Sequence, residues 1–358
     1  MQVQHEKLAD AATAIFEAAT SSAEEARKVA SRLVDANLTG HDSHGVIRIP
    51  QYVENVRTGA LKPNQTADVV SETGAVTVMD GRFGYGQIVG EQAIDAAIDK
   101  ARTQGIGMTT LRNAGHLGRI GDWASRAADA GMMSLNFVNA IGHQLIVVPH
   151  GAAEGRGSTN PIAIGVPIDG EDPAILDFAT SAVAEGKVRV ARNKGTFLQP
   201  HCLLDAEGIE TTDPNDLYGD PRGALLPFGG AISGHKGGGL WLMADLMAGG
   251  LSGGGCSRTP ENPPRPRSNM LSIVIDPAAF TDDPPAIVAE IRRYVDFIRS
   301  ARPRDPKTPV MLPGEPERKT RAERLARGIN IDPETWAQII EAGVSLGLDA
   351  GMLDGMIA

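Results

Sequence analysis

A strand, a glycine-rich turn and a helix follow one another early in this chain, and this order restricts the fold more than any other feature. Two strand-like runs within residues 67–79 lead through the segment DGRFGYGQIVG into a helical stretch over residues 91–104. The three glycines of residues 84–90 nearly match the G-x-G-x-x-G turn that binds dinucleotides. The next strand, residues 106–111, is not followed by the acidic residue that would hold a ribose hydroxyl. The pattern therefore has the layout of a dinucleotide-binding fold without completing the Rossmann fingerprint.

The length of the chain indicates more than one folding unit. At 358 residues it exceeds the usual limit of a single hydrophobic core, so we expect two domains, whose segments need not be contiguous. Hydrophobic residues make up 42% of the chain but aromatic residues only 4%, and there are 42 glycines and 23 prolines. This composition is typical of a soluble enzyme and predicts alanine-rich helices joined by many tight turns.

Charge and cysteine content exclude several classes of protein. A net charge of -10 disfavours nucleic acid or an anionic membrane as a partner, because both need clustered lysine and arginine. Cys202 and Cys256 are too few and too isolated for a disulfide scaffold or a thiolate zinc site. The start of the chain does not read as a signal peptide, and no run approaches the roughly 18 apolar residues of a membrane helix. We therefore expect a cytoplasmic protein.

The segment Gly40 to Tyr52, GHDSHGVIRIPQY, carries an unusual mixture of reactive side chains. Two amphipathic helical stretches precede it. The second begins at Ser22, where Ser22 and Glu25 form a capping-box pattern, and Gly40 ends it, so the segment is expected at a helix terminus. His44 and Arg48 are four residues apart and would project from one face of a helical turn, where they could hold a small anion. The alternative is a histidine-rich helix cap with a solvated arginine.

A second histidine lies in a glycine-rich turn, in the segment NAGHLGRIGDWASRAADAGM. The pattern places His116 between a strand and a helix, near the positive end of the helix, which favours a neutral imidazole. A neutral imidazole can accept a proton, so His116 is a candidate general base. The alternative is a buried histidine that is hydrogen-bonded to the backbone.

Two further segments are candidate anion sites. The turn GRGSTNP, residues 155–161, can offer backbone N–H groups to a phosphate, or it can be an ordinary turn. Lys236 and three glycines are expected at the start of a helix, which is another place where anions bind. Residues 240–248 of this helix are apolar on every side and therefore predict a buried helix.

Neither a metal site nor a hydrolase triad has its sequence signature. His41 and His44 are not four residues apart as in the H-E-x-x-H helix, and the nucleophile motif G-x-S-x-G is absent. The remaining set, neutral histidines, an arginine and glycine-rich turns, suits hydride transfer between a nicotinamide cofactor and a 2-hydroxy or 2-keto acid. The alternatives are a metal-dependent hydrolase or lyase that uses His41, His44 and His116, and a catalytically silent, oligomeric NAD(P)-binding protein.

Six segments in one order carry a family resemblance: GHDSHGVIRIPQYV, NAGHLGRIGDWA, GSTNPIAIGVP, LDFATSAVAEGK, HKGGGL and LPGEPE. Together they resemble the type 2 malate/L-lactate dehydrogenase family, which also holds ureidoglycolate, sulfolactate and 2,3-diketogulonate oxidoreductases. The resemblance spans essentially the whole chain. The segments DFATSAVAEGKVRVARNKG and CLLDAEG are most similar to the hydroxycarboxylate dehydrogenase B group, whose members reduce 2-keto acids with NADH.

The resemblance implies an α+β fold whose nicotinamide-binding domain is not a Rossmann fold. This α/β domain would span residues 67–284 and contain a mainly antiparallel sheet. A helical domain would form from both chain termini, residues 1–66 and 285–358, and would carry the segment 40–52. The protein would be a homodimer with active sites near the interface, and the glycines of residues 84–90 would be structural.

The resemblance also implies roles for individual residues. His116 would accept the proton of the substrate hydroxyl, Arg48 would bind the substrate carboxylate, and His44 would be the third catalytic residue. The substrate-binding residues would be Ser43, Arg48, Tyr52 and Asn139. The cofactor-binding residues would be His44, Thr159, Asn160, Asp177, Phe178, Ala179, Lys236, Pro313, Gly314 and Glu315. The cofactor would be NAD, with NADP as the alternative, the substrate a small 2-hydroxy or 2-keto acid, and no metal is expected.

The chain departs from the family pattern in two places. Members often carry a polar or basic residue near position 140 that touches the substrate, whereas this chain has Ala140, with Asn139 and His143 nearby. The loop of residues 257–267 is unusually rich in proline and arginine. Both departures concern the far end of the substrate.

Overall fold

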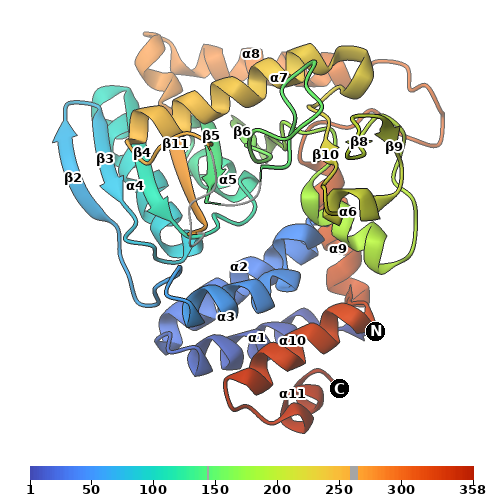
Figure 1. Cartoon of the computed structure of the whole chain (residues 1–358). Helices are drawn as coiled ribbons and strands as arrows, with labels where there is room; N and C mark the ends of the chain where they lie inside the picture. The colour runs from blue at the N-terminus through green and yellow to red at the C-terminus, as the bar shows by residue number, and fades with distance from the viewer. Residues whose placement is uncertain (143–144, 259–264) are drawn as a thin grey trace.

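The structure is a computed structural model that describes residues 1–142, 145–258 and 265–358. His143 and most of the Pro/Arg-rich loop therefore lie outside the described residues. A layer of helices from both ends of the chain lies below a seven-stranded sheet and its covering helices (Figure 1).

Helices and short strands make up most of the described chain (Figure 1). The α-helices are α1 (His5–Ala18), α2 (Ala23–Leu38), α3 (Ile49–Arg57), α4 (Gly86–Gln104), α5 (Gly121–Asp129), α6 (Glu185–Asn193), α7 (Gly230–Asp245), α8 (Pro284–Arg299), α9 (Glu315–Arg327), α10 (Pro333–Ser345) and α11 (Ala350–Ile357). Four 3-10 helices, η1 (Asp42–His44), η2 (Val46–Arg48), η3 (Pro214–Tyr218) and η5 (Pro277–Phe280), and one π-helix, η4 (Leu246–Gly250), complete the helical elements. The strands are β1 (Gln2–Val3), β2 (Asp68–Thr73), β3 (Val76–Asp80), β4 (Ile106–Ala114), β5 (Met133–Ile141), β6 (Ile162–Ile168), β7 (Glu171–Phe178), β8 (Leu203–Leu204), β9 (Glu210–Thr211), β10 (Ala224–Leu225), β11 (Arg267–Ile275) and β12 (Ile329–Asn330).

The large sheet has the order β2-β3-β4-β11-β5-β6-β7. Its neighbouring strands run antiparallel except for β3 and β4, which are parallel and are joined through α4. The strand–turn–helix pattern therefore predicts this one parallel unit correctly, but the unit belongs to a mainly antiparallel sheet. A Rossmann fold needs a parallel sheet, so the near match of residues 84–90 does not mark one.

The glycines of the turn before α4 have a packing role. The helix begins at Gly86, five residues earlier than the hydrophobic pattern predicts, because apolar periodicity becomes visible only after the glycines. A Cβ atom on Gly86 would lie 2.2 Å from the carbonyl oxygen of His116, and one on Gly90 would lie 2.9 Å from the Trp123 ring. Glycine at these positions lets α4 approach the turn after β4 and the start of α5.

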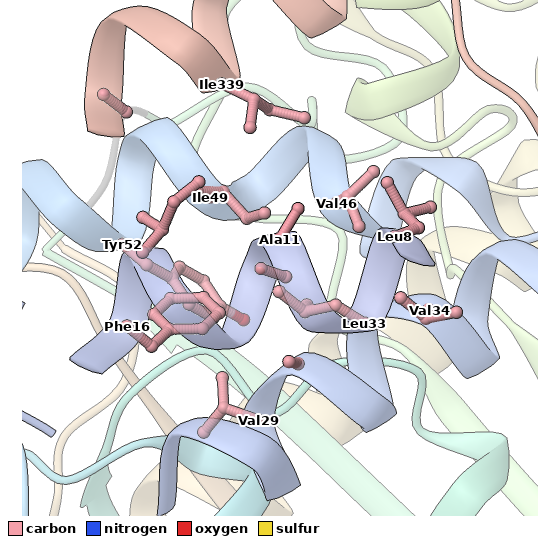
Figure 2. Packing of buried hydrophobic residues seen from close by; sticks show 14 of the residues in the cluster. Leu8, Ala11, Phe16, Val29, Leu33, Val34, Val46, Ile49, Tyr52 and Ile339 are labelled. Carbon is pink, nitrogen blue, oxygen red and sulfur yellow. The ribbon is translucent and has the colours of Figure 1, made fainter. Parts of the chain in front are cut away.

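The helical layer has its own hydrophobic core. Side chains of α1, α2, η2 and α3 interlock with side chains of α10, among them Leu8, Phe16, Leu33, Tyr52 and Ile339 (Figure 2). The Ser22 hydroxyl caps α2 by accepting a hydrogen bond from the backbone N–H of Glu25, as the sequence predicts. The two-stranded pair of β1 and β12 joins the beginning of the chain to its C-terminal region. This core fixes the direction in which the chain leaves α2.

The surface of α7 differs from the sequence prediction. Trp241 and Ala244 are buried, but Leu242 and Met243 are 45% and 53% exposed, so the prediction of a fully buried helix is wrong. An apolar sequence shows that a helix has few charged side chains. Its position in the fold decides how many of its sides are covered. The element begins at Gly230, but Ser233 has non-helical backbone angles that divide it into two helical segments. Lys236 therefore lies near the start of the second segment, as the sequence predicts.

Other expectations fare differently. The sequence also predicts a strand-like run over residues 145–148, where the structure forms isolated bridges through Val147. The helix α8 packs near β6, through a cluster that joins Val295 to Ile168 and Leu312. The division of the chain at residues 66 and 285 stays a prediction.

Within the described ranges, none of the helices has the length and apolar character needed to cross a membrane. Both cysteines are free thiols.

Candidate active site

A large cleft separates the helical layer from the loops of the sheet. Its volume is about 1010 Å³, at the upper end of the range in which small molecules and cofactors bind. The 40–52 segment, the turn after β4, the end of β7 and the start of α6 all contribute to its lining. Segments that are far apart in the sequence thus meet around one cavity.

A buried asparagine of α2 holds the 40–52 segment in place. The Asn37 side chain donates to the Asp42 carboxylate at 2.7 Å and accepts a hydrogen bond from the backbone N–H of Val46 at 2.9 Å. Gly45 passes so close that a Cβ atom there would lie 2.1 Å from the Asn37 carbonyl oxygen. The chain therefore turns through η1 and η2 in one defined conformation and presents His44 and Arg48 to the cleft.

His116 forms a short hydrogen-bonded chain with two side chains from other elements. The distance from the Tyr52 hydroxyl to His116 Nδ1 is 2.7 Å, and Gln87 Nε2 donates to the same hydroxyl oxygen at 2.8 Å. Burial raises the pKa of Tyr52 to about 12, against the opposing effects of Gln87 and Arg48, so the phenol is neutral at physiological pH. The ring of His116 is thereby oriented by a neutral partner.

His44 stacks on His116. Their ring centroids are 5.5 Å apart with an angle of 8° between the planes, and Ser43 Oγ lies 3.1 Å from His44 Nδ1. Burial lowers the pKa of His44 to about 3, with further lowering by Arg48 and His41. His44 is therefore an uncharged ring at neutral pH. We call the group of His44, Arg48, Tyr52 and His116 the His116 side of the cleft.

Arg48 is held by three neighbours. Its Nε donates to the Ser43 carbonyl at 2.7 Å, and its Nη1 donates to Gln51 Oε1 at 3.0 Å. Its Nη2 lies 3.6 Å from the carboxylate of Glu185, the first residue of α6. The guanidinium is thus fixed at the cleft wall.

The other side of the cleft is richer in carboxylates. Asp177 accepts a hydrogen bond from the backbone N–H of Gly121 at 2.8 Å, and burial raises its pKa. Arg119 and Asp122 form an ion pair at 2.6 Å, and His41 Nε2 lies 3.5 Å from Glu317. We call these five residues the Asp177 side. His41, Asp177 and Glu317 line both the large cleft and a smaller adjoining cavity of about 370 Å³, and Arg119 and Asp122 line the smaller cavity.

The structure brings most of the expected site residues together. Those that line the large cleft are Ser43, His44, Arg48, Tyr52, His116, Thr159, Asp177, Phe178 and Ala179. Gly314 lines the smaller cavity, and the Pro313 carbonyl accepts a hydrogen bond from the backbone of Ile175. Glu315 pairs with Arg299, and Lys236 is exposed on α7.

Two expected site residues are buried away from the cleft. Asn139 and Asn160 both donate to the Asp245 carboxylate, at 2.9 and 3.0 Å, and both are fully buried. In β5 the side chains alternate between the two faces of the sheet, so Val138 and Ala140 line the cleft while Asn139 points to the opposite face. Asn139 thereby holds β5, and Asn160 the loop before β6, to the end of α7.

Sequence reasoning missed Asn37, Gln87 and Glu185. Asn37 and Gln87 lie inside helices and match no motif. Glu185 follows a strand end that the sequence marks as polar, but nothing in the pattern indicates that it meets Arg48.

The histidines that the structure describes are not arranged as a metal site. Within residues 1–142, 145–258 and 265–358, no three histidine, cysteine, aspartate or glutamate side chains are placed to share one metal ion. His44 and His116 face each other with nearly parallel rings, so their nitrogens do not converge on one point. The stacked imidazoles of His44 and His116 lie beside Arg48 in a large cleft, an arrangement that suits the binding of a small acid.

Comparisons with known proteins identify the class of enzyme. Residues 3–340 match the malate/L-lactate dehydrogenase family. Hydroxycarboxylate dehydrogenase B of Escherichia coli K12 is 38% identical over 338 residues, which cover 94% of this chain and 91% of that protein. An L-lactate dehydrogenase of Cupriavidus necator is 36% identical, covering 89% of this chain and 90% of that protein. The solved sulfolactate dehydrogenase of Methanocaldococcus jannaschii superimposes with a TM-score of 0.84 at 30% identity, covering 98% of this chain and 99% of that chain.

The chain belongs to the malate/L-lactate dehydrogenase family. It is a 2-hydroxyacid dehydrogenase, and the family implies a nicotinamide cofactor. The family resemblance of the six sequence segments is thereby confirmed.

Proposed function

We propose that this enzyme transfers a hydride between NAD and the C2 position of a small 2-hydroxy or 2-keto acid. The observation that carries the proposal is the position of Arg48, which lies near the Tyr52–His116 pair on the same wall of the cleft. An arginine can bind the carboxylate of the acid, and a neutral histidine can take the proton of its hydroxyl. The carboxylate and the hydroxyl of a 2-hydroxy acid are on adjacent carbons, so the arginine and the histidine must both reach one small substrate.

His116 is the proposed proton acceptor. With its own proton on Nδ1, the ring donates to the Tyr52 oxygen, which also accepts from Gln87, while the Tyr52 proton points to the His116 carbonyl at 3.5 Å. This tautomer leaves Nε2 as the basic nitrogen of the ring. The stacked ring of His44 is uncharged, so it places no positive charge next to that nitrogen.

The residues around the cleft fit a nicotinamide cofactor. A bound nicotinamide accepts or supplies the hydride. The volume of the cleft admits a dinucleotide and an acid together, and Thr159, Asp177, Phe178 and Ala179 offer polar and aromatic contacts along it. Asp177 supports this assignment because its buried carboxylate, which accepts a hydrogen bond from the backbone N–H of Gly121, has further lone pairs that can accept hydrogen bonds from a ligand.

NAD is the proposed cofactor in preference to NADP. Two cations of α6 that could bind a 2′-phosphate, Arg189 and Arg192, already have partners within the protein. Arg189 pairs with Glu185 at 3.1 Å, and the Arg192 guanidinium lies 4.7 Å from the centre of the Tyr218 ring.

The test is the oxidation of NADH and NADPH, followed by absorbance, across a panel of 2-keto acids. We expect turnover with NADH on several members of the panel and a lower kcat/KM with NADPH. Tight NADH binding without turnover on any member would instead favour a catalytically silent binding protein.

We also propose that the enzyme is a homodimer. The exposed apolar side chains of α7 and η4, among them Leu242, Met243 and Leu246, support this proposal because such patches commonly mark interfaces. Sedimentation equilibrium of the wild type and of Met243→Glu tests it. We expect a dimer for the wild type and a weakened dimer for the variant.

A further inference from the structure

The proposed carboxylate clamp has a carboxylate of the protein beside it. Arg48 Nη2 lies 3.6 Å from Glu185 Oε2, and both side chains line the cleft. The other oxygen of Glu185 accepts hydrogen bonds from Arg189 at 3.1 Å and from the Tyr218 hydroxyl at 2.9 Å. Only 20% of the Glu185 side chain is exposed, so solvent screens its charge weakly.

Glu185 is ionised in this position. Burial alone would raise its pKa, but Arg48, Arg189 and the Tyr218 hydroxyl outweigh burial, and its pKa is lowered overall. The cleft therefore holds a fixed negative charge close to the cation that receives the substrate.

A glycine explains how α6 comes so near to the 40–52 segment. A Cβ atom on Gly186 would lie 2.2 Å from the Cβ atom of Ser43, so any larger residue would push α6 away from η1. Ser43 is the residue whose carbonyl accepts the Arg48 Nε–H, and Glu185 precedes Gly186 in the chain. The contact between Gly186 and Ser43 thus holds the Glu185 carboxylate next to the Arg48 guanidinium.

We propose that Glu185 makes this enzyme select 2-keto and 2-hydroxy acids with a single carboxylate and reject those with a second one. The inference rests on the proposed function. An acid bound to Arg48 through its first carboxylate brings a second carboxylate within a few ångströms of Glu185, where like charges repel strongly in a shielded site. Glu185 also neutralises Arg189, the neighbouring cation that could otherwise attract the second carboxylate.

The variant Glu185→Gln tests the proposal because it removes the charge and keeps the size of the side chain. Two substrates with the same four-carbon chain are compared, 2-oxobutyrate, which has one carboxylate, and oxaloacetate, which has two. We expect the ratio of kcat/KM for oxaloacetate to that for 2-oxobutyrate to rise by about 10- to 100-fold in the variant, since one unfavourable charge contact is removed. Glu185→Asp, which retains the charge, is expected to keep the low ratio of the wild type.

Glu210→Gln is the matched control. It makes the same change on an exposed residue that pairs with His201 and does not line the cleft, so the substrate ratio should stay at the wild-type value. An equal change of kcat/KM for both substrates in Glu185→Gln would overturn the proposal, since it would show that Glu185 only holds Arg48 in place.

A second measurement covers the case in which the variant turns over slowly. The dissociation constants of succinate and of its monoamide, succinamate, are measured by NADH fluorescence for the wild type and for Glu185→Gln with NADH bound. Succinate should gain affinity relative to succinamate in the variant, and an unchanged relative affinity would contradict the inference. A wild-type enzyme that turns over no 2-keto acid would contradict the proposed function instead, so the two failures are distinguishable.

Discussion

The His116 side and the Asp177 side of the cleft use burial in different ways. On the His116 side, burial keeps His44 and Tyr52 neutral, with pKa values of about 3 and about 12, and the charge of Arg48 is paired with Glu185. On the Asp177 side, Arg119 is paired with Asp122, and His41 lies beside Glu317. The His116 side is the proposed place of proton transfer, and the Asp177 side is the proposed place of cofactor binding.

The difference arises from the number of partners that each side offers. An isolated polar group that loses water adopts its neutral form, whereas paired charges compensate one another. His44 has a serine and another imidazole as neighbours, and the nearest charges to it are cations, which disfavour its protonation. The four predictions below test whether the two sides are functionally separate.

The largest effect is expected from His116→Ala. Loss of the proton acceptor should lower kcat by roughly 10²- to 10⁴-fold, the usual contribution of a general base. Steady-state kinetics with saturating cofactor measure the change. His201→Ala, on an exposed histidine paired with Glu210, is the control and should keep the wild-type kcat. Wild-type turnover in His116→Ala would remove His116 from the mechanism.

Arg48→Ala should act on substrate capture. Without the guanidinium, the carboxylate of the acid loses a charge-assisted contact, and kcat/KM should fall by about 10²-fold for every 2-keto acid. The KM for the cofactor should change little. Arg57→Ala removes an exposed arginine of α3 that pairs with Glu54, and it serves as the control. An unchanged kcat/KM in Arg48→Ala would contradict the role as a carboxylate clamp.

Asp177→Asn should give the opposite pattern. We expect the KM for NADH to rise by about 10-fold or more, the typical cost of losing a hydrogen bond to a charged group, with little change in the KM for the acid. Asp172→Asn, on the same strand but 71% exposed, is the matched control. If Asp177→Asn raised the KM for the acid and not for NADH, the assignment of the two sides would be reversed.

The smallest effect concerns stability and pH. The unfolded chain protonates His44 below its ordinary pKa of about 6.5, whereas the folded chain does not until about pH 3, so the free energy of unfolding falls as the pH falls through this window. The contribution reaches up to about 1.4 kcal/mol per pH unit. His44→Gln removes it, and urea unfolding at about pH 7 and pH 5 should show a smaller loss of stability in the variant than in the wild type. Equal losses in the two proteins would show that His44 is protonated in the folded state.

Much of the local structure follows from the sequence. The hydrophobic pattern predicts α1 and α2, and the Ser22 cap forms as the motif indicates. The sequence does not predict where α4 begins, because glycines hide the helical periodicity. It also does not predict the exposed surface of α7, because apolar composition does not show which side of a helix is covered. Among the site residues, His44, Arg48 and His116 are visible in the sequence as polar groups at turns. Asn139 also looks polar and near the site, but strand alternation turns it away from the cleft.

The sequence by itself determined which reactive groups this protein has, namely two histidines and an arginine at turns where a helix ends or begins. Only the tertiary structure decided which of these groups lie next to one another and which partners they have. Tyr52 and His116 are 64 residues apart in the chain, and Glu185 meets Arg48 because Gly186 lets α6 reach Ser43. The pKa of His44 is also a tertiary property, because it depends on burial and on charges that separate segments bring together.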